Sequence, residues 1–226
     1  MILAQSAKDP LIRWDWVWDH TDDIAAATWE HLRLTAVAVG VGFVISMALS
    51  MIGLRFPKTY SPITWVTGVM YTIPSLALFA MLVPVTGLTF LTAEIGLVSY
   101  TLLILVRNIT AGINGVPDEI REAALGMGYT PRKMFWEIEV PLAMPAIIAG
   151  LRIATVTTVG LVTITALITF GGLGSFIDSG LRRFFNTEII VGVVLSVALA
   201  VVLDLAIVMI ERWLTPWTRR RATAGN

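Results

Sequence analysis

Five long stretches of the chain are apolar and almost free of charged residues. These stretches cover residues 34–54, about 61–83, about 87–106, about 145–170 and 189–210. The charged residues inside them are Glu94, Arg152 and Asp204. Because about 20 apolar residues suffice for a helix to cross a bilayer, the pattern predicts an all-α polytopic membrane protein with about five transmembrane helices.

Composition agrees with this class and argues against several others. The 226 residues are 56% hydrophobic and 14% charged, whereas about a quarter of the residues in a soluble domain are charged. The formal net charge is zero, so no basic field favours binding to nucleic acid. Cysteine is absent and the two histidines, His20 and His31, precede the first predicted span. We therefore expect no disulfide, no metal site and no catalytic set of nucleophile and base.

Lysine and arginine are distributed unequally between the two sides of the predicted spans. One side holds Arg55, Lys58, Arg107, Arg121, Arg132, Lys133, Arg152, Arg212, Arg219, Arg220 and Arg221, and the other holds Lys8, Arg13, Arg33, Arg182 and Arg183. The basic side of a membrane protein is normally cytoplasmic. The N-terminus is therefore predicted to lie outside the cell and the C-terminus in the cytoplasm.

Three segments follow from this topology. Residues 1–33 form an extracytoplasmic N-terminal segment, residues 34–213 the transmembrane domain, and residues 214–226 a basic cytoplasmic tail. The first segment contains Trp14, Trp16, Trp18 and Trp29. These side chains fit an interfacial helix in contact with membrane lipid, or they pack against the first span.

The longest polar stretch, residues 107–141, is predicted to be a cytoplasmic loop with two short helices. Pro117 suits the first position of one helix, and Gly126 and Gly128 supply its stop, since glycine adopts the left-handed conformation at little cost. Thr130 is expected to cap a second helix that has Pro131 at its first position. This loop also contains an apolar knob formed by Ala123, Ala124, Leu125 and Met127. Its charged rim includes Arg121 and Glu122, as is typical of docking surfaces.

Ala123 and Ala124 of the knob belong to a spaced motif. Glu122-Ala123-Ala124 is followed by three residues, Gly128, nine residues and then Ile138-Glu139-Val140-Pro141. This spacing resembles the EAA loop of ABC-importer permeases, except that Val140 stands where that family usually has leucine. The alternative is an amphipathic loop helix that lies on the membrane surface.

The resemblance implies the type I ABC importer permease fold, in the bacterial plasma (inner) membrane. It implies that the loop docks into an ABC ATPase subunit dimer through Glu122, Ala123, Ala124, Leu125, Gly128 and Pro141. ATP and Mg would be bound by that ATPase, because the phosphate-binding pattern G-x-x-x-x-G-K-[S/T] is missing here. The other implied partners are a second permease copy or paralogue and an extracytoplasmic substrate-binding protein, with no cofactor in this chain.

Further segments resemble one branch of these permeases. "YTIPSLALFAMLVPV" from residue 71, "VRNITAGINGVPDEIREAALGMG" from residue 106 and "GGLGSFIDSGL" from residue 171 are similar to permeases of glycine betaine, carnitine and choline importers. This chain has "LITFGGLG" where the branch commonly has one more glycine. The resemblance implies a pathway for a quaternary ammonium osmolyte. The alternatives are a permease for an amino acid such as methionine, and a membrane scaffold that recruits a cytoplasmic regulator.

Pro74 interrupts the second predicted span. A proline removes a helical hydrogen bond and bends the helix, and freed backbone groups are tolerated in a membrane where a wet cavity or protein satisfies them. Tyr71, Pro74, Ser75 and Tyr100 are therefore candidates for lining a pathway, although packing explains them equally well. Aromatic faces attract quaternary ammonium groups, which adds Phe79 and Phe170 to the candidates.

Arg152 and Asp204 are charged residues inside predicted spans, where an ionisable group needs a partner. Arg152 follows the start of the fourth span by about as many residues as Asp204 precedes the end of the fifth. The two residues should therefore lie at equal depth, roughly 10 Å inside the cytoplasmic boundary at about 1.5 Å per residue. We predict an intramembrane ion pair between them. Glu94 is expected near the outer surface.

Overall fold

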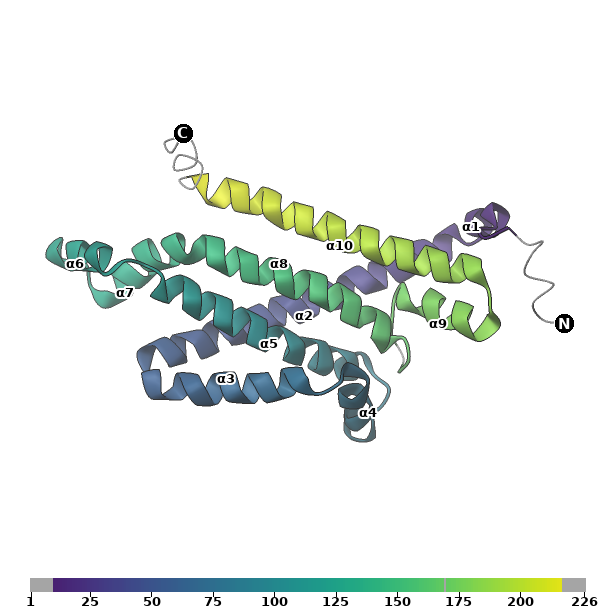
Figure 1. Ribbon diagram of the computed structural model, residues 1–226, viewed down its shortest axis with the longest axis horizontal. Helices are drawn as coiled ribbons and strands as arrows, with labels where there is room; N and C mark the ends of the chain where they lie inside the picture. The colour runs from purple at the N-terminus through teal and green to yellow at the C-terminus, as the bar shows by residue number, and fades with distance from the viewer. Residues whose placement is uncertain (1–9, 169, 217–226) are drawn as a thin grey trace.

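The long helices run roughly side by side along one long axis (Figure 1). The computed structural model describes residues 10–168 and 170–216. In chain order these form α1 (Trp14–Asp19), α2 (Thr21–Arg55), α3 (Pro57–Thr72), α4 (Ser75–Thr86), α5 (Phe90–Asn114), α6 (Asp118–Gly126), α7 (Pro131–Met134), the π-helical segment η2 (Phe135–Glu139), α8 (Val140–Thr165), α9 (Gly174–Arg183) and α10 (Asn186–Leu214). The part of the chain that the structure describes contains no strand, so the all-α prediction is confirmed.

Among the residues that the structure describes, four helical runs are long and apolar enough to cross a membrane. They are α2, α5, the continuous run Pro131–Thr165 and α10. The pair formed by α3 and α4 passes the same test but bends by 96° at its break. The number of spans is therefore four, or five if the bent pair counts as one span, and the chain is a multi-pass membrane protein.

Three helices do not begin or end where the predicted spans do. α2 begins at Thr21 rather than near residue 34, so the expected limit of the N-terminal segment falls inside a helix. α5 continues past Arg107 to Asn114, and α8 ends at Thr165 rather than near residue 170. Hydropathy marks only the length that can lie in lipid. Backbone hydrogen bonding continues a helix into the charged sequence that flanks it.

α2 and α5 approach closely because small residues line α2. Ala38, Gly42, Ser46 and Ser50 are all buried at every fourth position. A Cβ added at Gly42 would lie 1.9 Å from Thr101 Oγ1 of α5. The hydroxyls of Ser46 and Ser50 lie 3.5 and 3.4 Å from carbonyl oxygens of α5. Small residues at such spacing let two helix backbones pack together in a membrane.

The sequence placed His31 before the first span, but the structure places it within α2. It is fully buried in α2, and its Nε2 is 3.1 Å from the carbonyl oxygen of Val159 in α8. Gly172 packs directly on it with φ +47, and a Cβ there would lie 2.6 Å from the His31 Cβ. The chain therefore requires a glycine at this contact, both for its backbone conformation and for the space.

α10 lies at the edge of the bundle. It packs on α8 and α9, and Gly192 accommodates Leu173 and Ile177, since a Cβ would come within 2.8 Å of both. Only 6% of its most apolar stretch is buried inside the chain. Most of α10 therefore faces outward, toward lipid or another chain.

Candidate functional site

α6 and α7 lie at one end of the long axis, opposite α1 and α9 (Figure 1). The connection between α2 and α3, which carries Arg55 and Lys58, lies at the end occupied by α6. The predicted loop is shorter than residues 107–141, because α5 extends to Asn114 and α8 begins at Val140. What protrudes is α6 and the turn that follows it.

The motif residues of α6 divide between two faces. Glu122, Ala123 and Leu125 are exposed, with Leu125 at 52% and the following Met127 at 69%. Ala124 is fully buried, so its predicted place in the exposed knob was wrong. Residues three or four apart share a helix face, and Ala124 is on the inward one. Pro141 lies apart from this surface, in the first turn of α8.

The turn after α6 explains the spacing between the motif and its glycine. Gly128 has φ +83, and its N–H donates to the Leu125 carbonyl at 2.9 Å. The next N–H, of Tyr129, donates to the Ala124 carbonyl at 3.1 Å. These two bonds form a Schellman motif, which requires a left-handed residue at the position after the cap.

The second predicted loop helix starts as expected but does not end. Thr130 caps α7 by accepting a bond from the Lys133 N–H, with Pro131 at the first position. α7 then runs through η2 into α8 without a break, so a separate short helix was a wrong prediction. Pro117 is the N-cap of α6 rather than its first helical residue. The π-helical turn is notable because such turns are rare and occur often at functional sites.

Arg121 joins three parts of this region, and no motif indicated it. Its Nε donates to Glu139 Oε1 at 2.7 Å. Its Nη1 donates to Asp118 Oδ1 at 2.9 Å, and its Nη2 to the carbonyl oxygen of Ile113 at 2.7 Å. The hydrogen bond to Glu139 raises the pKa of Arg121 above its usual value, so the guanidinium is firmly charged. The spacing of 18 residues between Arg121 and Glu139 has no sequence signature.

The break between α3 and α4 contains three of the candidate pathway residues. Pro74 caps α4, and Tyr71 and Ser75 flank it, with Tyr71 39% exposed. Tyr100 of α5 is only 5% exposed, and its hydroxyl donates to the carbonyl of Ile73 at the break. Tyr100 therefore satisfies a carbonyl that lies outside both helices at the break. The lining of a pathway by these residues stays a prediction.

The four aromatic candidates do not form a cage. Phe79 is fully buried, where a Cβ at Gly96 would meet its ring at 2.2 Å. Phe170 packs edge-on against Phe90 at 6.2 Å between centroids. Only Tyr71 and Tyr100 are paired, edge-on at 5.9 Å. In the chain by itself the four rings do not surround one point, and their contact with a cation stays a prediction.

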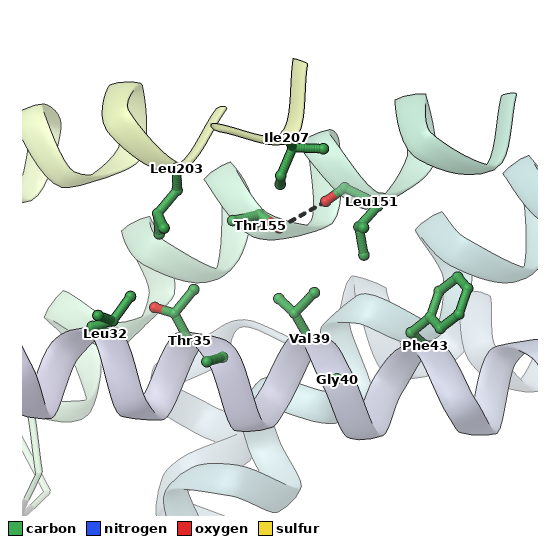
Figure 2. Close-up of a pocket in the computed structure, with 10 residues that line it drawn as sticks. Leu32, Thr35, Val39, Gly40, Phe43, Leu151, Thr155, Leu203 and Ile207 are labelled. Carbon is green, nitrogen blue, oxygen red and sulfur yellow. Dashed lines mark hydrogen bonds between the residues drawn. The ribbon is translucent and has the colours of Figure 1, made fainter. Parts of the chain in front are cut away.

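A cavity of about 360 Å³ separates α2 from α8 and α10 (Figure 2). Its lining consists of Leu32, Thr35, Ala36, Val39, Gly40, Phe43, Leu151, Thr155, Leu203 and Ile207. Thr155 donates to the carbonyl of Leu151, one turn earlier in α8. None of the ten lining side chains is charged.

Arg152 and Asp204 meet beside this cavity, next to Leu151 and Leu203. The Arg152 Nε lies 2.7 Å from Asp204 Oδ1, and its Nη2 lies 2.9 Å from Oδ2. This two-pronged contact is the favoured geometry between a guanidinium and a carboxylate. The structure thus brings together the two charges that the depth argument paired.

Two polar features lie near the opposite end. Glu94 is 7% exposed, and neither of its carboxylate oxygens has a hydrogen-bond partner among the described residues.

The second feature is a cavity of about 520 Å³ between the start of α2 and α9. It contains Trp16 stacked on His20 at 4.3 Å, and Glu188, which accepts a bond from the Ser179 hydroxyl at 2.7 Å. Among the described residues, no group of three or more metal-ligating side chains is found.

Comparison with proteins of known structure shows the fold. The chain is similar to a subunit of the MetNI methionine ABC transporter in an inward-facing conformation, with a TM-score of 0.78 and 23% identity over 87% of this chain and 98% of that one. It is also similar to a chain of an amino acid ABC transporter, with a TM-score of 0.67 and 18% identity over 91% of this chain and 98% of that one. The fold is that of type I ABC importer permeases.

Sequence comparison finds curated relatives along most of the chain. The choline transport system permease OpuBB of Bacillus subtilis is 35% identical, over 84% of this chain and 87% of the relative. The carnitine transport permease OpuCB of Listeria monocytogenes is 33% identical, over 90% and 94%. The osmoprotectant import permease OsmW of Salmonella typhimurium is 33% identical, over 88% and 94%.

The family model described as binding-protein-dependent transport system inner membrane component matches residues 40–220. That range includes α6, the broken pair and the Arg152–Asp204 contact. The chain therefore belongs to the family of inner-membrane permease components of binding-protein-dependent transport systems.

Proposed function

We propose that the chain forms the membrane pathway of an ATP-driven importer for a quaternary ammonium osmolyte such as glycine betaine, choline or carnitine. The observation that carries this proposal is the length of the likeness to permeases named for choline, carnitine and osmoprotectants, which covers 84–90% of the chain. The methionine and amino acid transporters share only the fold, at 18–23% identity. A scaffold protein is not expected to resemble permeases over 84–90% of its sequence.

ATP hydrolysis is expected on a separate ATPase dimer, which would bind ATP and Mg. The support is the protruding helix α6, whose outward face presents Glu122, Ala123, Leu125 and Met127. Charged residues are depleted and apolar ones enriched at the centre of docking surfaces. This end of the bundle also holds Arg55 and Lys58, which favours the cytoplasmic side.

The remaining partners follow from the same arrangement. With α6 in the cytoplasm, the N-terminus lies outside and the C-terminus inside; residues 217–226 of the predicted basic tail lie outside the described residues. A second permease copy or paralogue would complete the pathway, since the described part of one chain provides five spans at most and exposes most of α10. The end with α1 and α9 then faces an extracytoplasmic substrate-binding protein.

Uptake into proteoliposomes tests the substrate. The permease, its ATPase and its binding protein are reconstituted with ATP on the ATPase side, and labelled glycine betaine, choline, carnitine and methionine are compared. ATP-dependent uptake of at least one quaternary amine, with no uptake of methionine, is expected. Uptake of methionine alone would overturn the proposed substrate class, and uptake without ATP would overturn the mechanism.

A further inference from the structure

α6 has little apolar packing to hold it against the membrane helices. Ala124 is its only buried residue, and its outward residues face away from the bundle. Burial of one alanine side chain removes little apolar surface from water. A helix with so small a buried face needs another attachment if its movement is to be passed to its neighbours.

Arg121 supplies such an attachment, on the inward face that it shares with Ala124. Its side chain is 24% exposed, and that of Glu139 is 12% exposed. The guanidinium donates to Glu139 in η2 and to the Ile113 carbonyl in the last turn of α5. The Ile113 carbonyl already accepts from the Val116 N–H at 3.2 Å. A carbonyl oxygen has two lone pairs, so the guanidinium bonds to the same oxygen and anchors α6 to the end of α5.

The two anchored elements are the spans that pack on each other at this end. Phe135 of η2 and Val140 of α8 pack against a buried cluster that includes Ile109 and Ile113 of α5. A Cβ on Gly112 would lie 3.0 Å from the Ala146 Cβ, so the two backbones are in close contact here. A displacement of Arg121 therefore acts on both spans at once.

We propose that Arg121 and Glu139, which we call the Arg121 clamp, transmit the displacement of α6 to α5 and α8. In this role Arg121 is a positioning residue: it does not touch the substrate, and it is not needed for the ATPase to dock. Hydrogen bonds between charged groups are the strong ones, and arginine holds them in a rigid fork. The π-helical turn that contains Glu139 is where the helix register is least regular. This inference rests on the proposed coupling to an ATPase.

Arg121→Gln tests the clamp in the complete complex of permease, ATPase and binding protein. ATPase recovered with the permease is expected to stay within about twofold of the wild type, because the outward face of α6 is unchanged. Loss of charge-assisted bonds should lower uptake by about tenfold. The ATP hydrolysed per substrate imported should rise, because hydrolysis continues without full transmission.

Matched variants separate transmission from a general loss of charge. Arg132→Gln removes the same charge from an exposed position of α7 and should keep the wild-type ratio of ATP to substrate. Arg121→Lys keeps the charge without the fork and should fall between wild type and Arg121→Gln. In a cycle with Glu139→Gln, the double variant should be no worse than Arg121→Gln alone. An equal rise of the ratio in Arg132→Gln, or an unchanged ratio in Arg121→Gln, would overturn the clamp.

Amide hydrogen exchange tests the Arg121 clamp without a transport assay. In Arg121→Gln, exchange should increase in α6 and also in η2 and the first turn of α8, whereas Arg132→Gln should leave η2 unchanged. Unchanged exchange in η2 of Arg121→Gln would overturn the clamp even if uptake falls. Failure of the wild-type complex to import any quaternary amine would count against the proposed function alone.

Discussion

Gly128, in the turn after α6, is a residue whose replacement has a predictable consequence. Its φ of +83 lies in the left-handed region, and a Cβ there would meet no atom within 4 Å. Substitution by alanine therefore costs conformational energy but causes no clash within the chain. The cost for an L-residue in this conformation is about 1–2 kcal/mol, which corresponds to a change of roughly 5- to 30-fold in the population of the turn.

If the ATPase binds α6 only in this turn geometry, Gly128→Ala should weaken its affinity for the permease by the same factor. Gly128→Asn should weaken it less, because asparagine tolerates the left-handed conformation. Gly126 offers a matched control in the same turn: it also has open space around it but has no positive φ. Gly126→Ala should keep the affinity and stabilise α6 by up to about 1 kcal/mol.

The assay is a titration of purified ATPase onto the permease in lipid nanodiscs, with all four proteins at equal concentration. The expected order of affinity is wild type and Gly126→Ala, then Gly128→Asn, then Gly128→Ala. Equal losses in Gly128→Asn and Gly128→Ala would refute the conformational explanation, because space in the complex and not the backbone would then be limiting. An equal loss in Gly126→Ala would refute it as well.

Three further predictions concern the membrane helices and are read from thermal unfolding in detergent. Asp204→Ala alone should melt at a lower temperature than Asp204→Ala combined with Arg152→Leu, since the single variant leaves a charge unpaired in a span; additive effects would contradict the pairing. Tyr100→Phe should cost about 1–3 kcal/mol by leaving the carbonyl at the helix break without its donor, and an unchanged melting temperature would contradict that role. Gly42→Val should cost about 1–3 kcal/mol through overpacking against Thr101, whereas a stability equal to wild type would show that α2 and α5 separate freely.

Local chain chemistry was enough to predict the turn of the coupling loop. Gly128 and Thr130 act through the backbone of their immediate neighbours, so the residue types and spacing carry the information. The pairing of Arg152 with Asp204 followed from depth alone, because a membrane restricts a charge to few partners. These features are local in sequence or constrained by the bilayer.

Other features depend on contacts between distant segments, and the sequence does not show them. The sequence predicts a break at Pro74 but neither its 96° bend nor the bond from Tyr100, on another helix, to the carbonyl of Ile73. Arg121 looks like an exposed member of a charged rim until η2 places Glu139 beside it. The start of α2 at Thr21 was not predicted because a helix can continue into polar sequence, and hydropathy does not mark polar sequence as helical.

The central claim is that α6 faces the cytoplasm and contacts the ATPase. The chain contains no cysteine, so a single Ala123→Cys variant can be labelled in intact cells with a membrane-impermeant maleimide, with Leu181→Cys in α9 as the control for the opposite side. We predict that Leu181→Cys is labelled from outside, and that Ala123→Cys is labelled only after the membrane is opened and is protected by bound ATPase. Labelling of Ala123→Cys in intact cells would contradict the claim.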